Sequence, residues 1–227
     1  MAIRSKSFWG VALITVSLSI LWTGLSRAFS VFVPAKYNTM FADANTIFWH
    51  VLAPMALTYL VFFLLMRRME RLGQVYQQQP LIAHRGVRIL FAIIVIAMIL
   101  FSLFNLYQHL HAILNHWHHN SLARLLFAFM STFFVGLLEE SVFRGFALTE
   151  FLRRFNEPIS CLLSLILFGF WHLPNIIAGA PVIQASLQVF STMIIGFGLY
   201  MAVRLSRSIW GGVLMHWLWD FALVIAH

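Results

Sequence analysis

Hydrophobic positions along the chain fall into long runs that short polar loops separate. The runs lie near residues 8–28, 47–66, 88–108, 122–150, 159–177, 183–203 and 209–226. Each run is close to the ~20 residues that an α-helix needs to cross the hydrocarbon core of a bilayer. The pattern therefore predicts an all-α, polytopic transmembrane bundle of about seven spans. A membrane β-barrel would instead show alternating segments of about ten residues.

The fourth run is longer than a bilayer requires. A continuous helix from Leu122 to Leu152 would extend about 45 Å at ~1.5 Å per residue. We expect this segment to tilt, protrude or break. Gly136 and Gly145 lie within it, and glycines let neighbouring membrane helices come close.

Charge is scarce and unevenly placed. The chain is 61% hydrophobic and 10% charged, with a net charge of +8. The basic residues gather in the N-terminus and in the loops 67–88, 153–158 and 204–208. This is the distribution of a membrane protein whose basic loops stay in the cytosol, not of a nucleic-acid-binding protein. It predicts an integral membrane protein with a cytosolic N-terminus, and the short loops suggest a bacterial cell membrane. The single cysteine, Cys161, is expected in the core.

Three acidic residues lie inside the apolar runs: Glu139, Glu140 and Asp220. A charge at such a position costs several kcal/mol and usually marks a functional site. Glu140 and Arg144 are spaced i,i+4 and can form an ion pair. That pairing leaves Glu139 available for chemistry. The alternative is a buried ion pair with a purely structural role.

Two histidines are expected at a depth similar to that of Glu139. His172 lies on the polar face of the fifth run, where Pro174 ends or kinks the helix. In the last run, His216 and Asp220 share one helix face. The sixth run adds further polar residues that we expect to line the same interior: Gln184, Gln188 and Thr192.

These groups favour hydrolysis by water. A carboxylate beside an imidazole can deprotonate water, and a further donor can stabilise an oxyanion. The candidate metal ligands are Glu139, His172 and His216, which could bind a divalent metal such as zinc and acidify a bound water. The sequence contains no glycine-rich phosphate loop, serine-nucleophile elbow or HExxH helix.

Three short motifs follow one another on successive runs: "EESVFR", "FGFWH" and "HWLWD". They resemble the EExxxR, FxxxH and HxxxN motifs of the CPBP family of intramembrane proteases (Abi, CAAX-protease and bacteriocin-processing). That family includes the type II CAAX prenyl endopeptidases. The resemblance covers a core at 120–226, whereas the N-terminal spans in 1–110 carry no recognised motif.

The resemblance implies an intramembrane endopeptidase that acts on membrane-embedded or membrane-associated peptides or proteins. Glu139 would be the general base, with His172 assisting. His216 and the residue four positions further on would stabilise the oxyanion. Glu140 and Arg144 would brace the site.

Asp220 departs from the family pattern, because it stands where the family usually has Asn. An ionised aspartate cannot donate a hydrogen bond to an oxyanion. Asp220 would have to be protonated, orient His216, or bind the metal.

Two non-enzymatic functions stay open. The first is a non-catalytic protein of the same fold that gives bacteriocin immunity or scaffolds a membrane partner. The second is a transporter, since buried ionisable groups also form proton relays. Separately, the segment 107–120 holds His109, His111, His116, His118 and His119. It is interpreted as an interfacial segment rather than a metal-capturing or pH-sensing loop.

Overall fold

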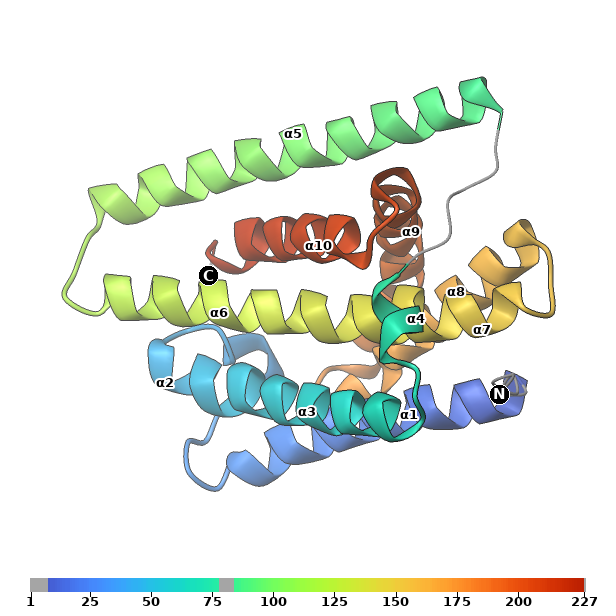
Figure 1. Cartoon of the computed structure of the whole chain (residues 1–227). Helices are drawn as coiled ribbons and strands as arrows, with labels where there is room; N and C mark the ends of the chain where they lie inside the picture. The colour runs from blue at the N-terminus through green and yellow to red at the C-terminus, as the bar shows by residue number, and fades with distance from the viewer. Residues whose placement is uncertain (1–7, 78–83, 227) are drawn as a thin grey trace.

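The computed structural model describes residues 8–77 and 84–226, and in this part of the chain it contains helices and loops but no β-strand (Figure 1). The α-helices are α1 (Phe8–Phe29), α2 (Ala44–Ile47), α3 (Ala53–Arg68), α4 (Leu72–Tyr76), α5 (Arg85–Asn115), α6 (Ser121–Glu140), α7 (Leu148–Leu152), α8 (Glu157–Trp171), α9 (Val182–Ser206) and α10 (Ile209–Val224). The 3-10 turns η1 (Tyr37–Thr39) and η4 (Leu173–Ile176) and the π-helical turns η2 (Phe48–Leu52) and η3 (Ser141–Ala147) complete the set.

The predicted all-α membrane bundle is confirmed. Among the described residues, 6 helical segments are long and apolar enough to cross a membrane. They are Phe8–Phe29, Ala44–Arg68, Arg85–Asn115, Ser121–Leu152, Glu157–Ile176 and Val182–Ser206. The seventh predicted run forms α10, which is apolar but only 16 residues long, about 24 Å at ~1.5 Å per residue.

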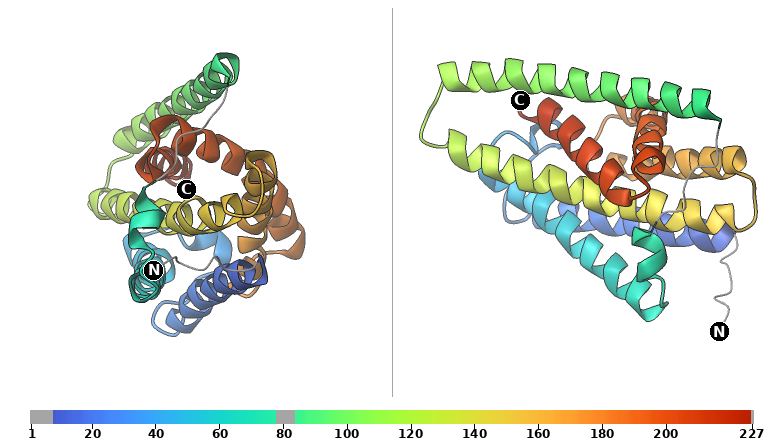
Figure 2. Two further views of the ribbon diagram at one scale, coloured as in Figure 1. Left: turned by 45° about the vertical axis from the view of Figure 1, so that its right-hand side comes forward. Right: turned by 45° about the horizontal axis from the view of Figure 1, so that its top comes forward.

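Helix α6 lies at the centre of the bundle. It packs against α3 on one side and α10 on the other, while α1 packs on α3 and α5 packs on α10 (Figure 1). Helix α9 runs across the other long helices and is seen almost end-on in Figure 1. It packs against α8, α10 and α5. Figure 2 shows that α1 begins and α10 ends at opposite ends of the bundle.

The long fourth run breaks its α-helical geometry at the acidic motif. Helix α6 ends at Glu140, and the chain continues through the π-helical turn η3 into α7. Such π-turns are rare and are frequent at functional sites. The two glycines allow close approach, as predicted. A Cβ at Gly136 would lie 3.1 Å from the Val213 carbonyl oxygen, and one at Gly145 would lie 2.6 Å from Val75 Cγ1.

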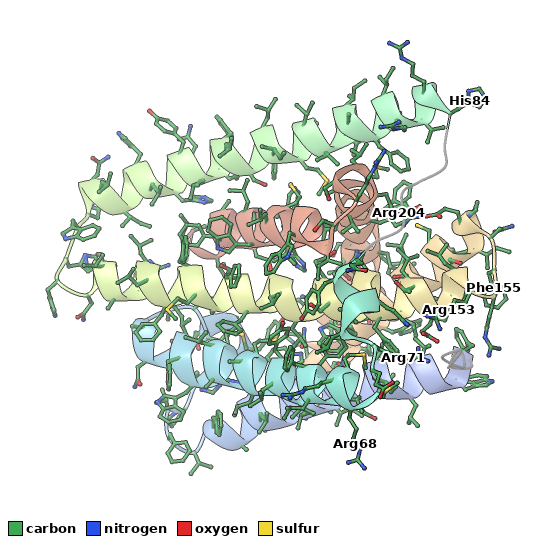
Figure 3. The ribbon with its side chains drawn as sticks, in the orientation of Figure 1. Arg68, Arg71, His84, Arg153, Phe155 and Arg204 are labelled. Carbon is green, nitrogen blue, oxygen red and sulfur yellow. The ribbon has the colours of Figure 1, made fainter. Side chains whose placement is uncertain are left out.

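The two ends of the bundle differ in charge. We call the end formed by residues 67–77, 84–88, 150–158 and 204–208 the arginine-rich end. Figure 3 shows that Arg68, Arg71 and Arg153 lie in the half of the molecule from which α1 starts. The opposite end is formed by residues 30–43 and 116–121 and by the C-terminal end of α10. Its cations among the described residues are Lys36 and Arg124, with Arg27 one turn before it.

Candidate active site

The ion pair predicted between Glu140 and Arg144 is confirmed. Arg144 Nη1 lies 2.8 Å from Glu140 Oε1, and both side chains are fully buried. The second guanidinium nitrogen, Nη2, donates to the Gly196 carbonyl at 2.7 Å. The guanidinium also lies 4.4 Å from the centre of the Phe168 ring, within the range of a cation–π contact. Arg144 therefore joins η3 to α8 and α9.

Glu139 points away from this pair, as the helical spacing predicted. Its side chain is 3% exposed, and its Oε1 accepts a hydrogen bond from Trp171 Nε1 at 2.8 Å. Its Oε2 is buried without a hydrogen-bond partner and faces His216 Nε2 at 3.7 Å. A buried carboxylate oxygen without a donor is costly.

His216 lies among three carboxylates. Its Nδ1 is 3.3 Å from Glu140 Oε1, and its Nε2 is 3.3 Å from Asp220 Oδ2 and 3.7 Å from Glu139 Oε2. Close packing makes this possible, because a Cβ at Gly212 would lie 2.6 Å from Glu140 Oε2. The predicted shared face of His216 and Asp220 is confirmed.

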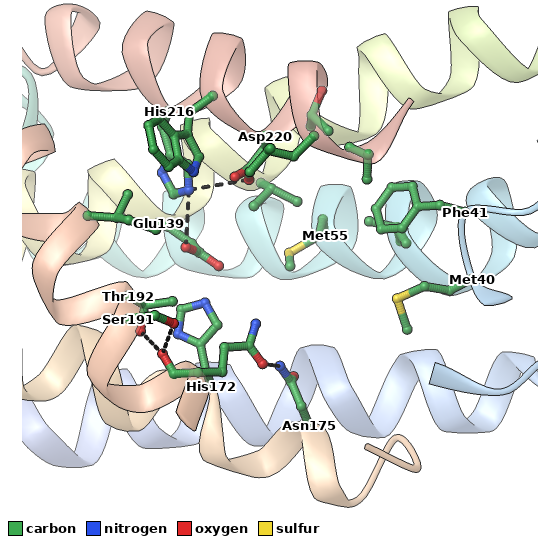
Figure 4. A pocket seen from close by; sticks show the side chains of 18 of the residues that line it. Met40, Phe41, Met55, Glu139, His172, Asn175, Ser191, Thr192, His216 and Asp220 are labelled. Atoms are coloured by element: carbon green, nitrogen blue, oxygen red, sulfur yellow. Dashed lines mark hydrogen bonds and ion pairs between the residues drawn. The ribbon is translucent and has the colours of Figure 1, made fainter. Parts of the chain in front are cut away.

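His172 lies across the cavity from His216 and Asp220 (Figure 4). It is the C-cap residue of α8 and precedes the turn η4, which contains Pro174, so the predicted helix end is confirmed. Its Nδ1 lies 3.0 Å from the Phe168 carbonyl oxygen. A carbonyl only accepts, so Nδ1 carries the proton and Nε2 carries a free lone pair.

These groups line one cavity of about 410 Å³. Glu139, His172, His216 and Asp220 all contribute to its wall, together with Gln188 and Thr192 from α9. Gln184 does not line it and is exposed instead, so that part of the α9 prediction was wrong. Residues of the N-terminal spans, including Trp22 and Met55, also form part of the wall.

The sequence did not point to two further residues of this cavity, Tyr37 and Asn175. Asn175 Nδ2 donates to Tyr37 Oη at 3.1 Å and to Gln188 Oε1 at 3.2 Å, and Tyr37 Oη donates to Gln188 Oε1 at 3.1 Å. Burial raises the pKa of the Tyr37 hydroxyl, so it stays protonated and serves as a donor. Trp171, which binds Glu139, was missed as well. A buried indole N–H needs an acceptor, and its position beside His172 was the available signal.

The predicted metal role of Glu139, His172 and His216 stays a prediction. Among residues 8–77 and 84–226, no three His, Cys, Asp or Glu side chains converge closely enough to hold a metal ion. Figure 4 shows His172 and His216 on opposite sides of Glu139. As placed, the donor set does not fit a metal, which needs three or four ligands within about 2.3 Å.

The histidine-rich segment lies elsewhere. His109, His116 and His118 line a second cavity of about 490 Å³ at the opposite end, beside Asp43 and Arg124. His109 Nδ1 donates to the Ala222 carbonyl at 2.7 Å, which is a packing role. Cys161 is buried and unpaired, as predicted.

Comparison with known proteins bears on the same part of the chain. Residues 120–222 match the family model described as type II CAAX prenyl endopeptidase Rce1-like. The resemblance to the CPBP family is confirmed over this region. No curated protein and no solved structure gives a significant match. The chain is thus an integral membrane protein whose residues 120–222 are similar to the type II CAAX prenyl endopeptidases.

Proposed function

We propose that the chain is an intramembrane endopeptidase that cleaves membrane-associated peptides or proteins with water as the nucleophile. The observation that carries this proposal is the placement of Glu139. Glu139 lines a cavity that His172 and His216 also line, and its Oε2 is buried without a hydrogen-bond donor. Glu140 Oε2 is likewise buried without a hydrogen-bond partner, but Glu140 does not line the cavity, so contact with the cavity is what distinguishes Glu139.

Glu139 acts as the general base in this mechanism. A water between Glu139 and the substrate carbonyl gives a proton to Oε2 as its oxygen attacks the carbonyl carbon. The protonated carboxyl then passes that proton to the nitrogen of the leaving amine, so that the C–N bond breaks without creating an amide anion. His172 assists, because its unprotonated Nε2 can accept a hydrogen bond from the same water.

His216 stabilises the oxyanion of the tetrahedral intermediate. Its Nδ1 faces Glu140 and its Nε2 faces Glu139 and Asp220. Once Glu139 has taken the proton from water and lost its charge, the Nε2–H of a His216 imidazolium donates to the oxyanion in place of Glu139. Preorganised donors of this kind typically contribute ~10²–10³ in rate. Among the three roles open to Asp220, its 3.3 Å contact with His216 Nε2 favours orientation of the imidazole. Glu140 and Arg144 brace the site without touching the substrate.

The test is Glu139→Gln. Glutamine keeps the shape and can still accept the Trp171 hydrogen bond, but it cannot take a proton from water. We expect a loss of ~10²–10⁴ in turnover with normal accumulation. Purified protein in liposomes is incubated with a mixture of synthetic single-span peptides, and cleavage is read by mass spectrometry. Glu70→Gln, the same change at an exposed loop residue, is the matched control.

Retained turnover in folded Glu139→Gln would contradict the mechanism. If neither protein cuts a peptide, the phenotype of cells that express each protein distinguishes the enzyme from the non-catalytic alternative. A Glu139→Gln protein that accumulates and still provides the native function supports the non-catalytic alternative, bacteriocin immunity or scaffolding. The cavity beside Glu139 favours the enzyme.

A further inference from the structure

The cavity that holds the candidate catalytic residues is reached from one end of the bundle. Its outer wall is formed by the segment between α1 and α2 and by the last turns of α10: Tyr37, Asn38, Met40, Phe41, Leu223 and Val224. Asn38 and Leu223 are exposed. Figure 4 shows Met40 and Phe41 on the side of the cavity away from Glu139 and His216. The entrance therefore lies at the opposite end, which residues 30–43 and the C-terminal end of α10 help to form.

The arginine-rich end is sealed. None of its described residues lines the cavity. Helix α4 packs directly on η3, where a Cβ at Gly145 would lie 2.8 Å from the Val75 carbonyl oxygen. Beside this contact, Arg71 forms a buried ion pair with Glu150. The crevice among Val75, Gly145 and Glu150 has no room for a water molecule.

A second layer of packing lies beneath this seal. Arg144 and Phe143 are fully buried, and the Phe143 ring packs edge-on against both Phe168 and Trp171 at centroid distances of 5.1 and 5.4 Å. Trp171 in turn hydrogen-bonds Glu139. A peptide that approached from the arginine-rich end would have to displace a buried ion pair and this aromatic layer.

Charge assigns the two ends to the two sides of the membrane. Short loops rich in Lys and Arg remain in the cytosol, so the arginine-rich end is the cytosolic one. The entrance between Asn38 and Leu223 then faces the other side. Near the entrance, the amide and hydroxyl groups of Tyr37, Asn175 and Gln188 offer donors and acceptors suited to an uncharged peptide backbone.

We propose that this site takes polypeptide segments that reach it from the non-cytosolic side of the membrane, such as the membrane-anchored ends of exported peptides. The proposal rests on the endopeptidase function above. It argues against substrates presented at the cytosolic face, because no described residue of the arginine-rich end lines the cavity.

Cysteine accessibility tests the route without any substrate. In a Cys161→Ala background, single cysteines are placed at Thr192, on the cavity wall, and at Ile194, which is 77% exposed on the lipid-facing side of the same helix. Asn38→Cys reports on the accessibility of the opposite end, and Arg154→Cys reports on that of the arginine-rich end. Intact cells and then permeabilised cells are treated with a small charged thiol reagent that does not cross membranes.

We expect Thr192→Cys and Asn38→Cys to react in intact cells and Arg154→Cys only after permeabilisation. Thr192→Cys should react about tenfold faster than Ile194→Cys, because a thiol in lipid rarely forms the reactive thiolate. Glu139→Gln should leave this labelling pattern unchanged even where it abolishes turnover. The labelling therefore tests the access route by itself, and the turnover tests the endopeptidase function by itself.

Three results would overturn the proposal. Labelling of Thr192→Cys only from the side that labels Arg154→Cys would contradict the route. Labelling of both Thr192→Cys and Asn38→Cys only after permeabilisation would place the entrance in the cytosol. No labelling of Thr192→Cys from either side would show that the cavity is closed.

Discussion

The protein has two clusters of buried and half-buried carboxylates, and they differ in how their charge is balanced. At the arginine-rich end, Glu150 pairs with Arg71 and Arg153, and Glu157 pairs with Arg204. In the centre, Glu139, Glu140 and Asp220 surround His216, and Arg144 is the one arginine that pairs with them among the described residues.

The second difference is the space beside each cluster. The contacts around Glu150 leave no room for a water molecule, whereas the central cluster borders a cavity of about 410 Å³. A carboxylate that forms an ion pair with an arginine and is tightly packed has a structural role. A carboxylate in excess of its arginines is unfavourable to bury, and the central ones lie next to a cavity, which is why we propose a catalytic role for them.

The largest effect on stability is expected from Arg144→Met. The change leaves Glu140 buried without its cation and removes the contacts with Gly196 and Phe168. Breaking a buried pair in this way typically costs about 3–5 kcal/mol. Thermal unfolding in detergent measures the loss, with the exposed Arg154→Met as the control. Equal unfolding temperatures for Arg144→Met and wild type would contradict the bracing role.

At the arginine-rich end, a paired replacement should be tolerated better than a single one. Arg71→Met alone leaves Glu150 uncompensated, whereas Arg71→Met combined with Glu150→Leu removes both charges. Replacing a buried pair with apolar residues is often close to neutral. We expect the double variant to recover at least ~1 kcal/mol of the single variant's loss, with turnover per folded molecule unchanged. A double variant that folds but is inactive would place this pair in the catalytic machinery.

The smallest effect is expected from Asp220→Asn, which restores the family's usual residue. Asparagine can still accept a hydrogen bond from His216, and it adds a donor. We expect turnover within about tenfold of wild type, because one neutral hydrogen bond contributes ~0.5–1.5 kcal/mol. Asp220→Ala, which removes both functions, is the comparison. A loss as large as that of Glu139→Gln would show that the charge of Asp220 is essential.

The sequence predicted the central cluster better than its surroundings. The i,i+4 spacings of Glu140 with Arg144 and of His216 with Asp220 determine contacts within one helix, so these pairings followed from the sequence. The π-turn at Ser141–Ala147 did not follow from the sequence. A continuous α-helix and a helix with one π-helical turn have nearly the same hydrophobic pattern.

Residues contributed by loops were also missed. Tyr37 lies 151 residues from Gln188 in the chain, and only the folded arrangement of the segment after α1 brings it to the cavity. Conversely, Gln184 was expected in the cavity because it shares a helix face with Gln188. It lies one turn nearer the start of α9 and is exposed, since a helix face does not show how far along the helix a cavity extends.

The comparison between the two clusters is tested most directly by one pair of variants, Glu139→Gln and Glu150→Gln, measured for both turnover and unfolding temperature. We predict that Glu139→Gln loses ~10²–10⁴ in turnover and unfolds at the wild-type temperature or above it. Glu150→Gln should unfold at a lower temperature while its folded fraction keeps wild-type turnover. A Glu139→Gln protein that is fully active, or a Glu150→Gln protein that is stable but inactive, would contradict the assignment of chemistry to the central cluster and structure to the other.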